Sequence, residues 1–151
     1  MDAKYRIDTQ ENKKFMKDMT QSLLEFGKHF ASPAGSAYYL GDDGTPWVDR
    51  PRETWITCRM AHVYSMGCML GYPDSDKLVG KALKGLTGEL RDKEFGGWYS
   101  GITSDGKILP NKQCYAHAFV ILAASSAILT GKSEAKKLLQ DALDVYDFRF
   151  W

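Results

Sequence analysis

Two helix-length segments of this chain carry almost no charge, and each is followed by a strongly charged segment of helical character. Between residues 54 and 70 the only formal charge is Arg59, and residues 113–131 have none. Residues 75–90 and 133–148 instead gather their charges on one side. A helix that is apolar all round is buried, whereas an amphipathic helix keeps one face in solvent. The sequence therefore predicts two layers, with inner helices backed by outer ones.

The ends of these segments carry residues typical of helix boundaries. Apolar residues at steps of three and four predict a first helix over 9–31. Pro51 lies at the start of the second helix and Gly71 just past its end, which is the usual asymmetry. Asp74 is a candidate N-cap for the third helix, and Gly131 ends the fourth. A fifth helix is expected from Ser133 to Phe148.

The stretch between the third and fourth helices has a different period. Residues 95–108 contain two short apolar or aromatic runs on either side of Ser104-Asp105-Gly106. Asp-Gly supplies the backbone angles of a tight hairpin turn, so a β-hairpin is predicted here. Residues 32–47 are irregular, with a short strand expected at 37–40.

A weak internal repeat relates the two uncharged segments. The pair Ala61-His62 recurs as Ala116-His117, and each segment ends at a glycine followed by a charged helix. A unit of about 55 to 60 residues is longer than common solenoid repeats and favours a toroid of helical hairpins. Two inner and three outer helices cannot close a ring. The chain is therefore expected to be a truncated part of a larger fold, closed either by its missing C-terminal part or by a second copy.

Composition excludes several classes of function. The 20 basic and 19 acidic residues form no stripe or tail, which argues against nucleic acid or an anionic membrane as partner. Residues 113–131 approach the length of a membrane span, but their Gln, Tyr, His and Ser residues favour a buried helix. A polar N-terminus without an apolar core predicts no secretory signal and a cytoplasmic location. Cys58, Cys68 and Cys114 lie in apolar runs and are expected to be buried thiols.

Several motifs follow one another along the chain: WITCRMAHVYSMGCMLG at 55–71, LRDKEFGGWYSGITSDGKI at 90–108, KQCYAHAF at 112–119 and RFW at 149–151. In this order they resemble the N-acylglucosamine 2-epimerase superfamily, in its branch of mannose and sulfoquinovose isomerases. The similarity runs from about residue 15 to 151. The most specific element is GGWY after a helix end containing RD, with the Asp-Gly hairpin behind it.

The resemblance implies an all-α fold, a partial (α/α)6 barrel with a small β-hairpin, in which residues 1–151 form the N-terminal part of one truncated domain. It implies a sugar isomerase that needs neither metal nor cofactor. Such an enzyme interconverts mannose and fructose, or a sulfonated analogue, by histidine proton transfer through a cis-enediol. The family's catalytic histidines lie on later inner helices, so no catalytic residue is assigned here and the chain is expected to be inactive alone. The alternatives are a 2-epimerase and a non-enzymatic helical module that binds sugar or a partner.

The resemblance also implies three substrate-binding residues, namely Arg59, Trp55 and Tyr115. A guanidinium is always charged and can stabilise a developing enediolate oxygen or hold hydroxyls. Trp55 lies one turn before Arg59 on the same helical face. For each residue a structural role stays open: an ion pair of Arg59 with Glu53, Asp49 or an acid elsewhere in the ring, a core position for Trp55, and a half-buried, hydrated Tyr115.

The remaining candidates are assigned structural roles. His62 and His117 occupy echoing positions, but a hydrogen-bonded core histidine is the commoner state. His29 is expected to be half-exposed. The carboxylates that might form a glycosidase pair lie in turns and at a helix end, where capping and solvation account for them: Asp42, Asp43, Asp92, Glu94 and Asp105. No zinc-ligand spacing or phosphate-binding loop is present.

Overall fold

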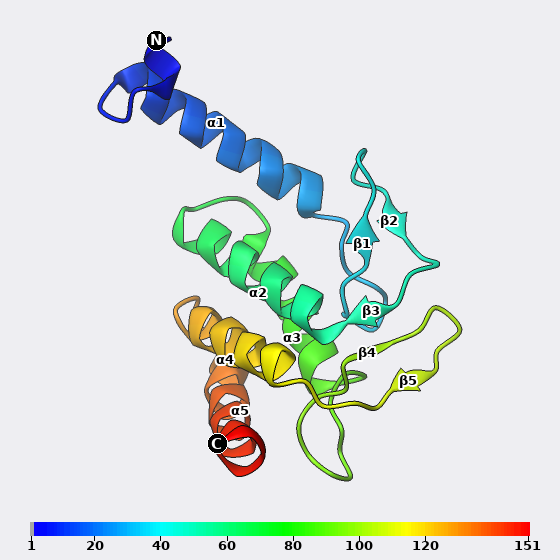
Figure 1. The fold of residues 1–151 in the computed structure, drawn as a ribbon. Helices are drawn as coiled ribbons and strands as arrows, with labels where there is room; N and C mark the ends of the chain where they lie inside the picture. The colour runs from blue at the N-terminus through cyan, green and yellow to red at the C-terminus, as the bar shows by residue number, and fades with distance from the viewer. Residues whose placement is uncertain (1) are drawn as a thin grey trace.

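The two uncharged segments form neighbouring helices at the centre of the protein (Figure 1). The computed structural model describes residues 2–151. Within that range the helices are η1 (Ala3–Tyr5), α1 (Gln10–Gly27), α2 (Thr54–Met69), α3 (Ser75–Thr87), α4 (Cys114–Ile128) and α5 (Ser133–Phe150). Helix α2 packs against α4, while α3 covers α2 and α5 covers α4. The predicted two layers are confirmed.

Small side chains allow the inner helices to approach closely. On α4, four alanines are fully buried: Ala116, Ala123, Ala124 and Ala127. The distance between packed helices is set by the side chains at the contact, so alanines permit a short one. The outer helix α3 supplies larger groups, Val79, Leu83 and Leu86, which are at most 1% exposed. The core therefore lies between the layers.

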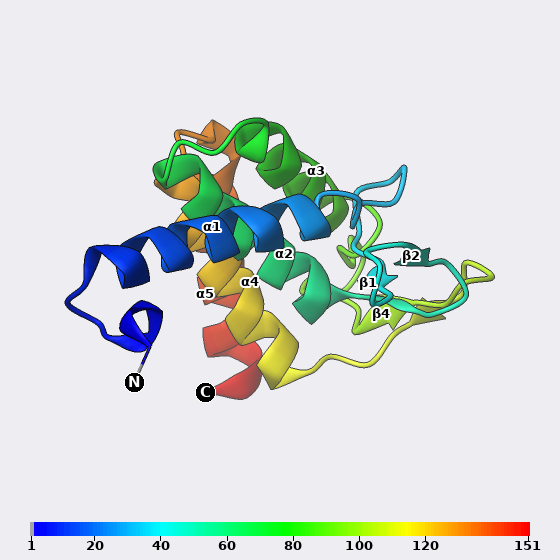
Figure 2. The same cartoon turned by 90° about the horizontal axis from the view of Figure 1, so that it is seen from above.

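Short strands gather at one end of the helices, beside the N-terminal ends of α2 and α4 (Figures 1 and 2). Strands β3 (Arg52–Glu53), β4 (Gly101–Ile102) and β5 (Ile108–Leu109) form an antiparallel sheet in the order β3-β4-β5. Strand β4 pairs with β5 through the predicted hairpin, whose turn residue Gly106 has a φ of +84°. A separate pair joins β1 (Tyr39–Leu40) to β2 (Pro46–Trp47).

The predicted start of the second helix was wrong by two residues. Arg52 and Glu53 are extended because they pair with Ile102 and Gly101 of β4. The helix begins at Thr54, whose backbone N–H donates to the Ser100 carbonyl over 3.0 Å. Pro51 consequently precedes a strand and is not the first helical residue.

The other boundary predictions hold in part. Gly71 ends α2 with a φ of +76°, and the N–H of the next residue, Tyr72, bonds back to the Gly67 carbonyl, as in a Schellman motif. Asp74 does precede α3, but its side chain caps nothing and contacts Lys77 Nζ at 2.6 Å. Helices α1 and α3 end four and three residues before the predicted ends, at Gly27 and Thr87.

Two compositional expectations can be compared with the structure. Cys58 is buried, but Cys68 is only partly buried and Cys114 is exposed, so burial of all three thiols was wrong. Cys114 is the first residue of α4, and its thiol lies 3.4 Å from the Tyr146 hydroxyl of α5. No helix within residues 2–151 combines the length and apolarity needed to cross a membrane.

Candidate functional site

The three predicted substrate-binding residues lie together near the N-terminal ends of α2 and α4. The rings of Trp55 and Tyr115 are 5.9 Å apart between centroids. The Arg59 guanidinium carbon lies 4.8 Å from the Trp55 ring centroid and 5.3 Å from that of Phe119. Because residues four apart share a helical face, Trp55 and Arg59 on α2 meet Tyr115 and Phe119 on α4. With Tyr39, these residues are called the aromatic–arginine cluster below.

Arg59 is exposed and forms no ion pair with any residue in the described part of the chain. The structural alternative, a pair with Glu53, Asp49 or another acid, is therefore not observed among residues 2–151. Glu53 instead accepts a hydrogen bond from the Tyr39 hydroxyl. Among the described residues the guanidinium contacts the two aromatic faces, a cation–π arrangement that orients a charge while its N–H donors stay available.

Tyr39 and Phe119 were missed by the sequence analysis. The Tyr39 ring contacts Trp55 edge-on at 6.3 Å, and Tyr115 lies 4.9 Å from Phe119. Burial, together with the hydrogen bond to Glu53, raises the pKa of Tyr39 to about 12. This phenol therefore stays neutral and donates to Glu53. Phe119 could have been found from its helical spacing, but Tyr39 comes from an irregular segment without any such pattern.

A second guanidinium lies at the edge of the cluster. The Arg50 guanidinium carbon is 5.3 Å from the Tyr39 ring centroid and 4.7 Å from that of Trp47. Tyr115 is 53% exposed, so about half of its surface is open to solvent. The site thus combines flat aromatic faces with a charged donor and a hydroxyl. Such a surface suits a small polyhydroxylated ligand, whose C–H groups pack on rings and whose hydroxyls need donors and acceptors.

Neither inner-helix histidine belongs to this cluster. His117 is fully buried, and its Nε2 accepts the Trp98 backbone N–H over 3.1 Å, while Nδ1–H donates to the Gln113 carbonyl at 2.8 Å. Burial lowers the pKa of His117, so the ring is neutral. His62 Nδ1 lies 2.7 Å from Ser126 Oγ, which itself donates to the Leu122 carbonyl. The hydroxyl therefore accepts from Nδ1–H, which fixes the tautomer.

Of the carboxylates in the turns, Asp92 has a structural role, but it is buried and ion-paired where solvation was expected. Asp92 is buried, accepts the backbone N–H groups of Glu94 and Phe95, and contacts Lys112 Nζ at 2.5 Å. The Lys112 hydrogen bond is the largest influence that lowers the pKa of Asp92, to about 2. Within residues 2–151, no three His, Cys, Asp or Glu side chains converge to form a metal site.

Residues 35–151 match the N-acylglucosamine 2-epimerase (GlcNAc 2-epimerase) family. The chain belongs to this family. It is 37% identical over 130 residues to a D-mannose isomerase of Thermobifida fusca, covering 85% of this chain and 32% of that protein. It is also 42% identical over 113 residues to a D-mannose isomerase of Pseudomonas cannabina pv. alisalensis, covering 74% and 27%. The chain thus spans about a third of the length of these relatives.

Solved structures of family members show the same fold. A crystal structure of D-mannose isomerase superposes with a TM-score of 0.82, covering 96% of this chain and 37% of the other at 20% identity. Cellobiose 2-epimerase from Spirochaeta thermophila gives 0.77, covering 95% and 38%, also at 20% identity. The predicted family and fold class are confirmed: the helices form part of an (α/α)6 barrel.

Proposed function

We propose that this chain is the N-terminal part of an aldose–ketose isomerase acting on mannose, and that Arg59, Trp55 and Tyr115 bind the sugar. The observation that carries the proposal is the placement of Arg59. The Arg59 guanidinium stacks on Trp55 and Phe119 and forms no ion pair among the described residues. The two relatives described above are named D-mannose isomerases. An exposed arginine that stacks on two rings keeps its N–H donors free for a ligand.

The proposed chemistry divides into two tasks. Isomerisation removes a weakly acidic C–H proton beside a carbonyl, which needs a base with a pKa near the working pH. It also needs a fixed positive group that stabilises the enediolate oxygen. Arg59 is proposed for the second task. His117 cannot serve as the base, since both ring nitrogens bond to the backbone. We therefore place the proton-transfer histidines outside residues 1–151, and expect metal- and cofactor-independent catalysis.

Two alternative functions are compatible with the same site. A 2-epimerase would use the same deprotonation and return the proton to the same carbon, and the similarity to cellobiose 2-epimerase supports the fold such an enzyme needs. A sulfonated aldose would place its anion near Arg50 and Arg59, both of which lie against rings of the cluster. Mannose is preferred because both of the curated relatives described above are named for it.

The test compares the 151-residue chain with the same chain extended by the sequence that follows it in its reading frame. Each is incubated with mannose, and fructose is followed by NMR. We expect no product from the 151 residues alone and steady conversion by the extended protein. In the latter, Arg59→Met should lower kcat/KM by about 10²- to 10³-fold, the usual loss for a group that stabilises an oxyanion.

Arg6→Met is the matched control, because Arg6 is an exposed arginine near the N-terminus. It should leave kcat/KM unchanged. Fructose made by the 151-residue chain would refute the placement of the proton-transfer groups. An extended protein that epimerises mannose or another aldose at C2 without forming a ketose would refute isomerase in favour of epimerase.

A further inference from the structure

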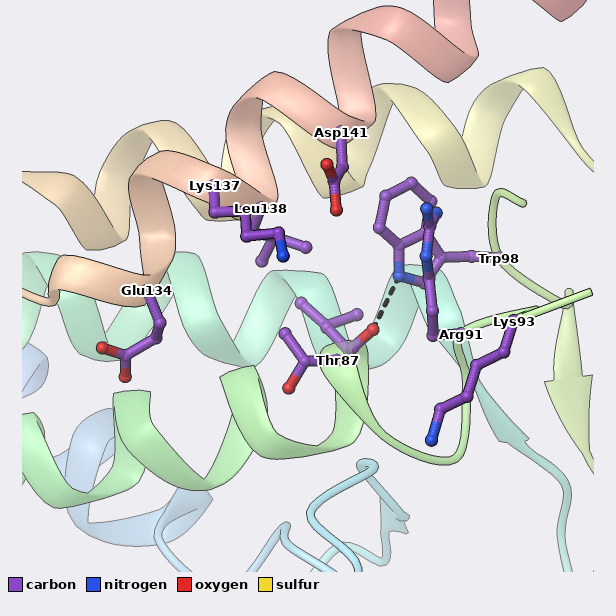
Figure 3. Close-up of a pocket in the computed structure, with 9 residues that line it drawn as sticks. Thr87, Arg91, Lys93, Trp98, Glu134, Lys137, Leu138 and Asp141 are labelled. Carbon is purple, nitrogen blue, oxygen red and sulfur yellow. Dashed lines mark hydrogen bonds between the residues drawn. The ribbon is translucent and has the colours of Figure 1, made fainter.

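A cavity in the outer layer shares no residue with the aromatic–arginine cluster. It is a pocket of about 400 Å³ between the C-terminal end of α3, the loop after it, and α5 (Figure 3). Its apolar floor consists of Leu86, Trp98 and Leu138, which are at most 3% exposed. Helices α3 and α5 each pack on an inner helix and do not pack extensively on one another, so the space between them stays open.

The pocket holds a guanidinium that has one buried N–H group without an acceptor among the described residues. The Arg91 guanidinium carbon lies 4.3 Å from the centroid of the Trp98 ring, and the indole N–H donates to the Leu86 carbonyl over 2.7 Å (Figure 3). The hydrogen bond therefore fixes the position of the Trp98 indole against which the Arg91 guanidinium stacks. Arg91 Nη1 is buried without a hydrogen-bond partner in the described residues. A buried, unsatisfied donor is costly and is usually explained by a water or an ion.

Other charges surround Arg91 without neutralising it. Lys93 follows it in the loop, and α5 contributes Glu134, Lys137 and Asp141 to the lining. Within residues 2–151, no ion pair within 4 Å joins any two of these five side chains. Figure 3 shows Asp141 on the same side of the pocket as Arg91, with the Glu134 carboxylate further along α5. The pocket is thus lined by three cations and two carboxylates that form no ion pairs with one another among the described residues.

We propose that this pocket binds a small hydroxylated oxyanion, a sugar phosphate or a sugar acid. A guanidinium recognises phosphate and carboxylate alike with two parallel hydrogen bonds, and Lys137 adds positive charge at the rim. Glu134, Asp141 and the Thr87 hydroxyl supply acceptors for ligand hydroxyls. The volume lies within the usual range of small-molecule sites.

The binding test uses glucose 6-phosphate and gluconate as probes and uncharged glucose as the ligand control. Binding to the 151-residue chain is followed by calorimetry and by the ¹H–¹⁵N resonance of the Trp98 indole. We expect both anions to bind and to shift the Trp98 resonance, with glucose binding at least tenfold more weakly. Raising the salt concentration should weaken the binding of both anions, because charges near the surface are screened.

Matched variants test whether the anions bind in this pocket or elsewhere on the surface. Lys136 and Lys137 are adjacent exposed lysines of α5, and only Lys137 lines the pocket. Lys137→Glu should weaken anion binding about tenfold or more, while Lys136→Glu should leave it nearly unchanged. Arg91→Met should abolish it. If Arg91→Met fails to fold, the lysine pair alone decides the question.

Arg59→Met distinguishes this pocket from the proposed sugar site. It should leave anion binding and the Trp98 shift intact. Equal effects of the two lysine variants, binding lost in Arg59→Met, or glucose binding as tightly as its 6-phosphate would each overturn the proposal. So would an absence of anion binding to the unaltered chain, which would mean that Arg91 pairs with Asp141 in solution. None of these outcomes bears on mannose isomerisation.

Discussion

The His117 imidazole is neutral because both ring nitrogens bond to the backbone and the ring is buried. Burial holds its pKa below the ordinary value of 6.5. Below that value the unfolded chain binds a proton that the folded chain resists, so stability is full above about pH 6.5 and falls as the pH drops. We expect urea denaturation to give a smaller free energy of unfolding at pH 5 than at pH 7.

Variants at two histidines test this expectation. His117→Gln should lower stability at pH 7 by about 1–3 kcal/mol, because the Trp98 N–H loses its acceptor, and should flatten the change between pH 7 and 5. His29→Gln is the control, since His29 is exposed beside the end of α1. It should keep the pH dependence of the unaltered chain. An undiminished pH dependence in His117→Gln would assign the effect to other groups.

At the residue scale, what the sequence predicts depends on how far apart the partners lie along the chain. Trp55 and Arg59 are one helical turn apart, so their contact follows from helix geometry alone. The contact between Trp55 and Tyr115 depends on α2 packing against α4, which the shared lack of charge predicts. Tyr39 was missed because its position is set by a two-residue strand pairing and a hydrogen bond to Glu53.

At the element scale, the buried ion pair of Asp92 and Lys112 joins the turn after α3 to the start of α4. Its side chains are 5% and 16% exposed. Asp92 has a folded pKa of about 2, below its ordinary value of 3.8. Its contribution is therefore present above about pH 4 and is lost as the pH falls toward 2. We expect Asp92→Asn to lower the free energy of unfolding at pH 7 by about 2–3 kcal/mol.

Asp105→Asn is the matched control, because Asp105 pairs with Lys107 in the exposed hairpin turn. It should change stability by less than about 1 kcal/mol. The difference between the two variants, measured by urea denaturation, should shrink as the pH is lowered from 4 to 2. Equal losses in both variants at pH 7 would contradict the structural role of Asp92.

At this scale the sequence predicts whether a helix is buried or amphipathic, but it predicts the first and last residues of a helix less exactly. Charge patterns separate α2 and α4 from α3 and α5 without knowledge of their neighbours. The extended Arg52–Glu53 segment could not be found in this way, because its partner β4 lies nearly fifty residues later. The loop at 32–36 is similar: Ser36 is held by Glu89 and Arg52 from distant elements.

At the scale of the whole molecule, the protein has an exposed apolar surface. We relate this surface to the part of the barrel that we propose lies outside residues 1–151. Large apolar side chains of α1 and α2 are 42% to 65% exposed, namely Met16, Met19, Leu23, Phe26, Val63, Met69 and Leu70. A pocket lined by Leu23, Leu24, Val63 and Leu70 lies between these helices. An exposed apolar patch of this kind marks a surface that another protein segment covers.

We expect the 151-residue chain to self-associate through this surface. Burial of apolar surface is the dominant favourable contribution to most protein–protein association. Light scattering after size exclusion should show dimers or larger species at tens of micromolar, and the double variant Met19→Glu, Leu23→Glu should be monomeric. Ile108→Glu changes an equally exposed apolar residue of the hairpin and should not alter the distribution. A monomer at every concentration would count against an uncovered barrel face. If the chain extended by its downstream sequence were monomeric, that sequence would be identified as the segment that covers the face.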